Sequence, residues 1–361
     1  MPDRRIENLN IASEDPLMTP NQLKRQFPLT ETVIQTVMTG QSTIKNIIDG
    51  KDPRIFVVVG PCSIHDPGAA REYAMRLRAL ADEVKDSIYL IMRVYFEKPR
   101  TTTGWQGLIN DPFLDKSGDI ESGLKIARSL LLDIAQMDLP AAGEALDIVT
   151  PQYVQDLFSW TAIGARTTES QTHRKMASGF STAVGFKNGT NGDLDIAINA
   201  LSSAAVGHNF ISVDPNGDVA VIRTKGNPYT HIILRGGRKP NYDSEHVIAC
   251  EKRLIQNGHQ PVIMIDCSHA NSGKNPNNQE IVLENVGDQI VNGNLSVRGL
   301  MLESHLNGGK QSISGKLETL KYGVSVTDAC IDWDTTARII KKFRERIKPC
   351  IEKRFKSISL L

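Results

Sequence analysis

The sequence predicts an α/β fold in which eight strand–helix units close into a single (β/α)₈ barrel. Three observations predict it: eight short, apolar, β-branched runs recur along the 361 residues, amphipathic segments separate them, and no exact repeat or low-complexity tract breaks the alternation. Continuous apolar runs of this length are typical of parallel strands covered by helices. Eight consecutive units favour a closed TIM barrel over an open, doubly wound sheet.

Each predicted strand is an apolar run between polar or turn-forming segments. The eight runs occupy 55–60, 88–96, 139–146, 161–166, 182–187, 231–236, 261–266 and 297–304. The segments between them carry apolar residues at three- and four-residue spacing with charge on the other face, the pattern of a surface helix. Helices are predicted at 68–84, 123–137, 244–258 and 278–293, and a last helix at 335–353.

Two segments fall outside this pattern, and we expect them to serve oligomer contacts or regulation. Residues 1–50 form an N-terminal extension, in which Thr19 followed by proline is a typical helix start and a longer helix is predicted at about 31–48. The rest of the chain, 51–361, is expected to be the catalytic barrel. It carries an insertion at about 210–224, where two alternating runs flank Asp-Pro-Asn-Gly, a pattern that predicts a β-hairpin.

The composition excludes several classes of function. There are 42 basic and 41 acidic residues, and the net charge of +1 argues against nucleic-acid and membrane-surface partners. The five cysteines are irregularly spaced without a CxxC motif, as expected in a reducing cytoplasm. The N-terminus lacks an apolar signal core, and no run approaches the roughly 20 apolar residues that span a bilayer. We therefore expect a cytoplasmic protein.

Reactive or charged side chains follow every predicted strand, at the point where the strand ends. The carboxyl ends of barrel strands meet on one face, and barrel enzymes place their active sites there. In chain order these residues are Cys62, Arg93 with Lys98 and Arg100, Glu144, Arg166, Lys187, Arg235, His269 and Glu303. Because barrel stability needs no charge at this face, we expect these side chains to form a site.

The cations follow the second, fourth, fifth and sixth strands, so they should line one half of the barrel mouth. Arginine binds phosphate or carboxylate through two parallel hydrogen bonds, and lysine supplies a movable charge and a proton. The set predicts a ligand with several negative charges, such as two phosphorylated substrates, one of which is also a carboxylic acid. Any one of these residues could instead be an ordinary surface cation on the rim.

The first, seventh and eighth strands are neighbours in a closed barrel, and they supply Cys62, His269 and Glu303. These are ligand types of a transition-metal site, and Asp328 offers a fourth, oxygen ligand. The mixed set predicts one divalent ion, which could be Mn²⁺, Fe²⁺, Co²⁺ or Zn²⁺. Taken singly, Cys62 could be a small buried apolar residue and His269 a hydrogen-bonded core histidine, whereas a lone buried Glu303 would be costly.

At these residues the sequence closely resembles the type I 3-deoxy-D-arabino-heptulosonate 7-phosphate synthases. The matching motifs are GPCSIHD (60–66), MRVYFEKPRTTTGWQGLINDP (92–112), AIGARTTESQTHR (162–174), GFKNGT (185–190), HIILRGG (231–237), DCSHANS (266–272) and SVTDAC (325–330). The resemblance covers nearly the whole chain, including the extension and the hairpin. It implies a (β/α)₈ barrel, a homodimer or homotetramer, and in many members inhibition by one aromatic amino acid.

The resemblance also implies residue roles. The family's metal ligands fall on Cys62, His269, Glu303 and Asp328. Its phosphoenolpyruvate contacts fall on Arg93, Lys98, Glu144, Ala165 (through its backbone), Arg166, Lys187, Arg235 and His269. Its erythrose 4-phosphate contacts fall on Lys98, Arg100, Thr101 and Asp328. Its effector pocket falls on the N-terminal segment around Asn8 and on Asp147, Gln152, Ser181 and Phe210. The stretches 9–23 and 321–331 are most similar to the tyrosine-sensitive form.

The implied reaction condenses phosphoenolpyruvate with erythrose 4-phosphate and water, as the first step of the shikimate pathway. We expect the metal to polarise the aldehyde as a Lewis acid, Lys98 to protonate the new alkoxide, and Glu144 or the metal to hold the attacking water. His269 is expected to contact both metal and phosphoenolpyruvate. Three alternatives stay open: the related octulosonate-phosphate synthase that uses arabinose 5-phosphate, a metal-dependent aldolase, and a non-catalytic paralogue that binds phosphometabolites or an aromatic amino acid.

Overall fold

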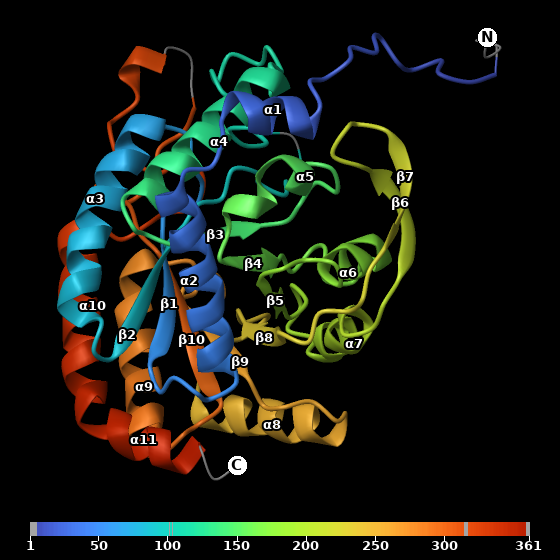
Figure 1. The fold of residues 1–361 in the computed structure, drawn as a ribbon. Helices are drawn as coiled ribbons and strands as arrows, with labels where there is room; N and C mark the ends of the chain where they lie inside the picture. Colours follow the sequence, from blue (N-terminus) through green and yellow to red (C-terminus); the bar gives the residue numbers. More distant parts are fainter. Residues whose placement is uncertain (1–5, 101, 103, 314–316, 359–361) are drawn as a thin grey trace.

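The structure is a computed structural model that describes residues 6–100, 102, 104–313 and 317–358. Eight parallel strands close into a barrel, as predicted, and helices surround it (Figure 1). The barrel strands are β1 (Ile55–Gly60), β2 (Ile88–Arg93), β3 (Ala141–Glu144), β4 (Trp160–Ile163), β5 (Ala183–Lys187), β8 (Thr230–Leu234), β9 (Ile263–Asp266) and β10 (Val297–Glu303). They neighbour one another in chain order, and β10 pairs with β1 to close the barrel, with Gly60 opposite Glu303.

The outer helices follow the strands, and their apolar faces bury against the sheet. They are α3 (Pro67–Val84), α4 (Ile120–Gln136), α5 (Pro151–Val154), α6 (Gln171–Ala177), α7 (Asp195–Ala204), α8 (Ser244–Gln256), α9 (Gln279–Val291), α10 (Trp333–Ile347) and α11 (Ile351–Ile358). The prediction of one continuous last helix over 335–353 was wrong, because the structure has two helices there. A 3₁₀ turn at Lys348–Cys350 separates α10 from α11, because Pro349 has no N–H to continue the helical hydrogen bonds.

The N-terminal segment contains two helices, of which the second packs against the amino ends of barrel strands. The predicted start at Thr19 is confirmed, since Thr19 and Gln22 form a capping box at α1 (Pro20–Gln26). The next helix, α2 (Glu31–Ile48), places Ile44 and Ile47 in the same buried cluster as Phe56 and Trp160, which lie at the starts of β1 and β4. The amino ends of the strands are therefore covered, and the carboxyl ends remain for a site.

The predicted hairpin is confirmed as β6 (Asn209–Val213) paired antiparallel with β7 (Val219–Arg223), and it stands outside the barrel (Figure 1). Its turn is stabilised by Asp214, whose Oδ1 accepts the N–H groups of Asn216 and Asp218. Asn21 of α1 donates to the turn at Pro215 O, 2.8 Å away. The hairpin is thus attached to the N-terminal segment rather than to the barrel sheet. No helix in the described part of the chain is long and apolar enough to cross a membrane.

Candidate active site

A cavity of about 480 Å³ lies at the carboxyl ends of the strands. It brings together residues that are far apart in the sequence and that end or follow seven different strands. From the predicted set its lining contains Arg93, Lys98, Arg100, Glu144, Ala165, Arg166, Lys187, Arg235, His269 and Asp328. Thr101, the remaining predicted sugar-phosphate contact, lies outside the described residues. The structure therefore gathers the described phosphoenolpyruvate contacts that the resemblance implied around one cavity.

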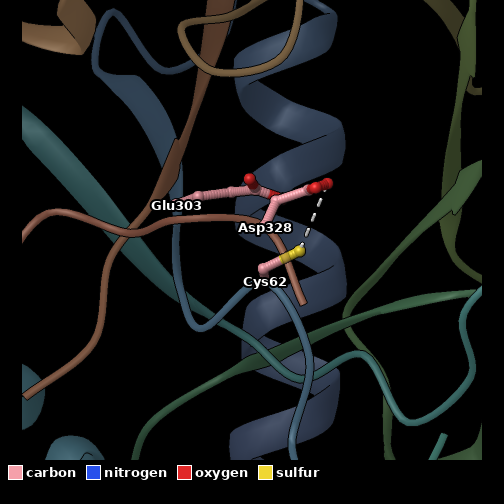
Figure 2. Close-up of side chains that lie close together, drawn as sticks. All are labelled: Cys62, Glu303 and Asp328. Atoms are coloured by element: carbon pink, nitrogen blue, oxygen red, sulfur yellow. Dashed lines mark hydrogen bonds between the residues drawn. The ribbon is translucent and has the colours of Figure 1, made fainter. Parts of the chain in front are cut away.

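Three of the four predicted metal ligands form a compact group at one side of this cavity (Figure 2). Each of Cys62, Glu303 and Asp328 offers a ligand atom within 4.8 Å of the others, and Cys62 Sγ lies 3.8 Å from Asp328 Oδ2. Cys62 follows β1, Glu303 ends β10, and Asp328 lies in the segment after β10. The backbone of Glu303 is fixed by the buried side chain of Gln279, which contacts both its N–H and its carbonyl oxygen at 2.8 and 2.9 Å.

Two cations, the buried Arg93 and the half-buried Lys98, balance this group. Arg93 Nη2 lies 3.0 Å from Glu303 Oε1, and Lys98 Nζ lies 3.1 Å from Cys62 Sγ. Burial alone would raise the pKa of Glu303, but the charges of His269, Arg93 and Lys98 outweigh it and lower the pKa to about 2. Burial raises the pKa of the Cys62 thiol, and the charge of Glu303 adds to that effect. One thiol and two carboxylates at this spacing, with an imidazole beside them, fit a divalent transition-metal ion.

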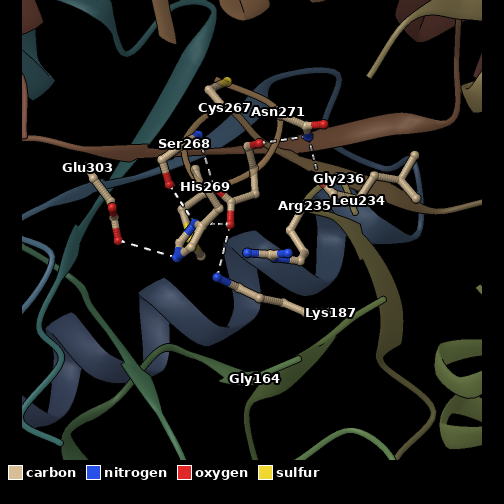
Figure 3. A network of polar contacts seen from close by, with 12 residues as sticks. Gly164, Lys187, Leu234, Arg235, Gly236, Cys267, Ser268, His269, Asn271 and Glu303 are labelled. Carbon is tan, nitrogen blue, oxygen red and sulfur yellow. Dashed lines mark hydrogen bonds and ion pairs between the residues drawn. The ribbon is translucent and has the colours of Figure 1, made fainter. Parts of the chain in front are cut away.

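His269 lies at the edge of this group, in an unusual backbone conformation. Its Nε2 is 3.7 Å from Glu303 Oε1, and its φ of +52° falls in the left-handed region that non-glycine residues rarely adopt. Its Nδ1 faces Asp266 Oδ2 at 2.8 Å and Ser268 Oγ at 2.6 Å. Figure 3 shows the ring between Glu303 on one side and Lys187 and Arg235 on the other. His269 thus lies between the metal half and the anion half of the site.

The cations that line the anion half of the site are partly neutralised by a carboxylate of the protein, which the sequence did not lead us to expect. Lys187 Nζ lies 2.9 Å from Asp266 Oδ2, and both side chains are buried. Arg93 pairs with Glu303 across β1, which lies between β2 and β10. Lys187 pairs with Asp266 across β8, which lies between β5 and β9. Inward side chains of alternate barrel strands share a layer, so charges two strands apart meet. Burial lowers the pKa of Arg235, and the charge of Arg166 adds to that effect.

Arg93 is also stacked on an aromatic ring. Its Cζ lies 3.5 Å from the centroid of Tyr95, and both side chains are almost fully buried. Its Nε and Nη2 donate to the carbonyl oxygens of Pro61 and Cys62. The guanidinium is therefore held in one orientation before any ligand arrives.

Sequence reasoning missed several residues of the site. Asp266 ends β9 inside the DCSHANS motif, yet a carboxylate at a strand end was assigned only at Glu144 and Glu303. Lys274 lines the cavity, and Lys310 lines an adjoining pocket with Glu303 and Asp328. Both lysines lie several residues beyond their strands, so a search confined to strand ends does not find them; a search of the whole loops would have found them.

The five predicted effector residues come from separate segments. Asn8 lies before α1, Asp147 lies in the loop between β3 and α5, Gln152 lies in α5, Ser181 precedes β5, and Phe210 lies in β6. Asp147 caps its own loop by accepting the N–H groups of Val149 and Thr150. Within the described residues no hydrogen bond joins any two of the five, and their role as an effector site stays a prediction.

Comparison with known proteins gives consistent matches over most of the chain. The model of the DAHP synthetase I family matches residues 27–341. The Tyr-sensitive phospho-2-dehydro-3-deoxyheptonate aldolase of Escherichia coli (strain K12) is 55% identical over 340 residues, which cover 94% of this chain and 96% of that protein. The Phe-sensitive protein of the same organism is 51% identical over 342 residues, covering 95% and 97%. The solved structure of the corresponding aldolase from Francisella tularensis SCHU S4 has a TM-score of 0.92 at 47% identity, covering 94% of this chain and 99% of that one.

Proposed function

This chain belongs to the DAHP synthetase I family, and we propose that it condenses phosphoenolpyruvate with D-erythrose 4-phosphate and water. The products are 3-deoxy-D-arabino-heptulosonate 7-phosphate and inorganic phosphate, the first step of the shikimate pathway. The observation that carries the proposal is a cavity lined by several cations and by Asp328, which is also a member of the Cys62–Glu303–Asp328 group. A polyanionic substrate and a carbonyl substrate are both accommodated by such a lining.

Phosphoenolpyruvate is held by the cations of the cavity. Arg93 is preorganised by Tyr95 and Glu303, and Lys187 by Asp266. Arg166 and Arg235 complete the set with guanidinium groups suited to two-point binding of phosphate or carboxylate. Holding the enol in place against the aldehyde supplies the positioning part of the rate enhancement.

One divalent ion, Mn²⁺, Fe²⁺, Co²⁺ or Zn²⁺, is proposed as the cofactor, with Cys62, Glu303, Asp328 and His269 as its ligands. A bound ion of this kind supplies Lewis acidity toward a carbonyl oxygen. Lys98 lies half-buried beside the same group; desolvation would lower its pKa, but the interactions with Cys62 and Glu303 outweigh it and raise the pKa. The side chain therefore carries a proton at neutral pH.

The bonds change in the following order. Carbon 3 of phosphoenolpyruvate attacks the aldehyde carbon, and Lys98 donates its proton to the aldehyde oxygen, which becomes a hydroxyl group. Water adds to carbon 2 and loses a proton, with Glu144 at the cavity wall as its acceptor. The carbon 2–oxygen bond to phosphate then breaks while the new hydroxyl group on carbon 2 passes its proton to the leaving phosphate, which leaves a ketone and inorganic phosphate. Arg100 and Asp328 also line the cavity and are assigned to the sugar phosphate.

The test is phosphate release from phosphoenolpyruvate by the full chain with each possible co-substrate. Release with erythrose 4-phosphate and little with arabinose 5-phosphate supports the proposal. Preference for arabinose 5-phosphate would indicate the octulosonate-phosphate synthase instead, and no release with either sugar and any of the four metals would indicate a binding paralogue.

We also propose feedback inhibition by an aromatic amino acid, with tyrosine as the first candidate, in a cytoplasmic homodimer or homotetramer. The identities to the Tyr-sensitive and Phe-sensitive relatives differ by few percentage points, so each aromatic amino acid has to be tested. Inhibition by tyrosine at lower concentration than by phenylalanine or tryptophan supports this assignment. The mass of the assembly follows from light scattering on the full chain.

A further inference from the structure

Asp266 is fully buried and contacts both halves of the candidate site. Its Oδ2 lies 2.9 Å from Lys187 Nζ and 2.8 Å from His269 Nδ1. Its Oδ1 accepts the backbone N–H and the hydroxyl of Ser268 at 3.0 and 2.8 Å. Contacts on both oxygens therefore fix its orientation, and the ammonium group of Lys187 with the two donors of Ser268 favours the charged carboxylate.

This carboxylate determines which nitrogen of His269 carries the proton. The Ser268 hydroxyl donates to Asp266, so its oxygen faces His269 Nδ1 as an acceptor, and Asp266 Oδ2 is a second acceptor there. In the neutral imidazole the proton accordingly lies on Nδ1. Nε2 then presents its lone pair toward Glu303, 3.7 Å away. Without Asp266, the other tautomer could donate from Nε2 to Glu303 and would offer no lone pair on that side.

Separate hydrogen bonds hold the backbone around His269. The left-handed φ of His269 is costly, and it persists where surrounding contacts fix it. Lys274 N–H and the Ser272 hydroxyl donate to the carbonyl oxygen of His269, at 2.8 and 3.2 Å. The amide of Asn271 donates to the carbonyl oxygens of Asp266 and Leu234, at 2.9 and 3.0 Å (Figure 3). The turn that carries the imidazole is thus tied to the end of β9.

We propose that Asp266 is a positioning residue that orients His269 toward the metal group and Lys187 toward the anion cavity at the same time. The inference rests on the proposed function, because that function assigns His269 and Lys187 to the site. A carboxylate that hydrogen-bonds a ligand histidine from behind raises the ligand's basicity and fixes its ring, and loss of such a partner typically costs about 10- to 100-fold in metal affinity.

The test measures the Kd for Mn²⁺ by electron paramagnetic resonance of the free ion, on the full chain and without substrates. Asp266→Asn is expected to raise this Kd about 10- to 100-fold. Lys187→Met removes the other contact of Asp266 Oδ2 and a nearby positive charge, so its Kd should be unchanged or lower. Asp156→Asn is the matched control, since Asp156 pairs with the buried Arg128 at 2.8 and 3.0 Å outside the cavity lining; its Kd should equal that of the wild type.

A loss of stability alone would not change the Kd of the folded protein, and a double variant guards against misfolding. Asp266→Asn leaves Lys187 buried without its carboxylate, whereas Asp266→Asn combined with Lys187→Met removes both charges and should still show the raised Kd. A Kd within twofold of the wild type in both Asp266 variants would overturn the inference while leaving the proposed function intact. If the wild type itself binds no Mn²⁺, the proposed metal site and this inference are both overturned.

Discussion

The stack of Arg93 on Tyr95 predicts that the ring of Tyr95, and not its hydroxyl, supports the site. The guanidinium lies 3.5 Å from the ring centroid, and the two side chains are 0% and 1% exposed. A desolvated cation–π contact of this kind contributes about 2 kcal/mol. Among the described residues, none hydrogen-bonds the Tyr95 hydroxyl, and an unpaired buried hydroxyl costs about 1–3 kcal/mol.

Tyr95→Phe should therefore leave the protein as stable as the wild type or more stable, with an unchanged Kd for phosphoenolpyruvate. Relative to Tyr95→Phe, which also lacks the hydroxyl, Tyr95→Leu should lower the free energy of unfolding by about 2 kcal/mol for the lost stack and by roughly 1–3 kcal/mol more for the space left by the smaller side chain. If the whole stacking energy is lost from the binding of phosphoenolpyruvate by Arg93, the Kd for phosphoenolpyruvate rises by up to about 30-fold. Urea unfolding, followed by the fluorescence of the buried Trp160, and equilibrium dialysis of phosphoenolpyruvate measure these quantities. Equal losses in the Phe and Leu variants would refute the stacking argument.

Three further predictions follow from the same structure. Lys98→Met should lower kcat about 10²- to 10⁴-fold with a much smaller change in the Kd for phosphoenolpyruvate, because other cations still line the cavity; single-turnover kinetics that survive the change would place the acid elsewhere. Burial, with the charge of Asp147 adding to it, raises the pKa of Glu97 to about 8 from an ordinary 4.5. Between these values the folded protein retains a proton that the unfolded chain has lost, so stability falls as the pH rises, by roughly 5 kcal/mol at most. Glu97→Gln should be more stable than the wild type at pH 9 and similar to it at pH 5 by urea unfolding, and parallel pH profiles would contradict the assignment. Gly299→Ala would place a Cβ 2.3 Å from the ring of Phe56 inside the barrel, so a stability loss of about 1–3 kcal/mol is expected by the same assay; wild-type stability would show that the barrel can expand at this point.

The strands and their reactive ends were predictable because both are local properties of the sequence. Val57, Val58 and Val59 form a run that only a doubly covered strand buries, and the structure buries all three. Cys62, His269 and Glu303 could be assigned to one side because strand order in a barrel follows chain order, which makes the first and last strands neighbours.

The roles of Asp266 and Tyr95 could not be predicted in this way. Lys187 and Asp266 meet across β8, which requires the tilt and register of three strands as well as their order. Tyr95 lies in an apolar stretch, and nothing in its neighbours indicates that its ring packs beneath Arg93 rather than in the core. The interruption of the last helix, by contrast, was predictable from the sequence, because Pro349 lacks the N–H that a continuous helix needs.

Phosphate release from phosphoenolpyruvate and erythrose 4-phosphate, before and after chelation and with Mn²⁺ added back, tests the central claim most directly. The wild type should lose activity on chelation and regain it with Mn²⁺, while Cys62→Ala, which removes the sulfur ligand of the proposed metal group, should show little activity under either condition. Release that persists unchanged in the chelated wild type, or a Cys62→Ala variant with full metal-dependent activity, would contradict the proposed site.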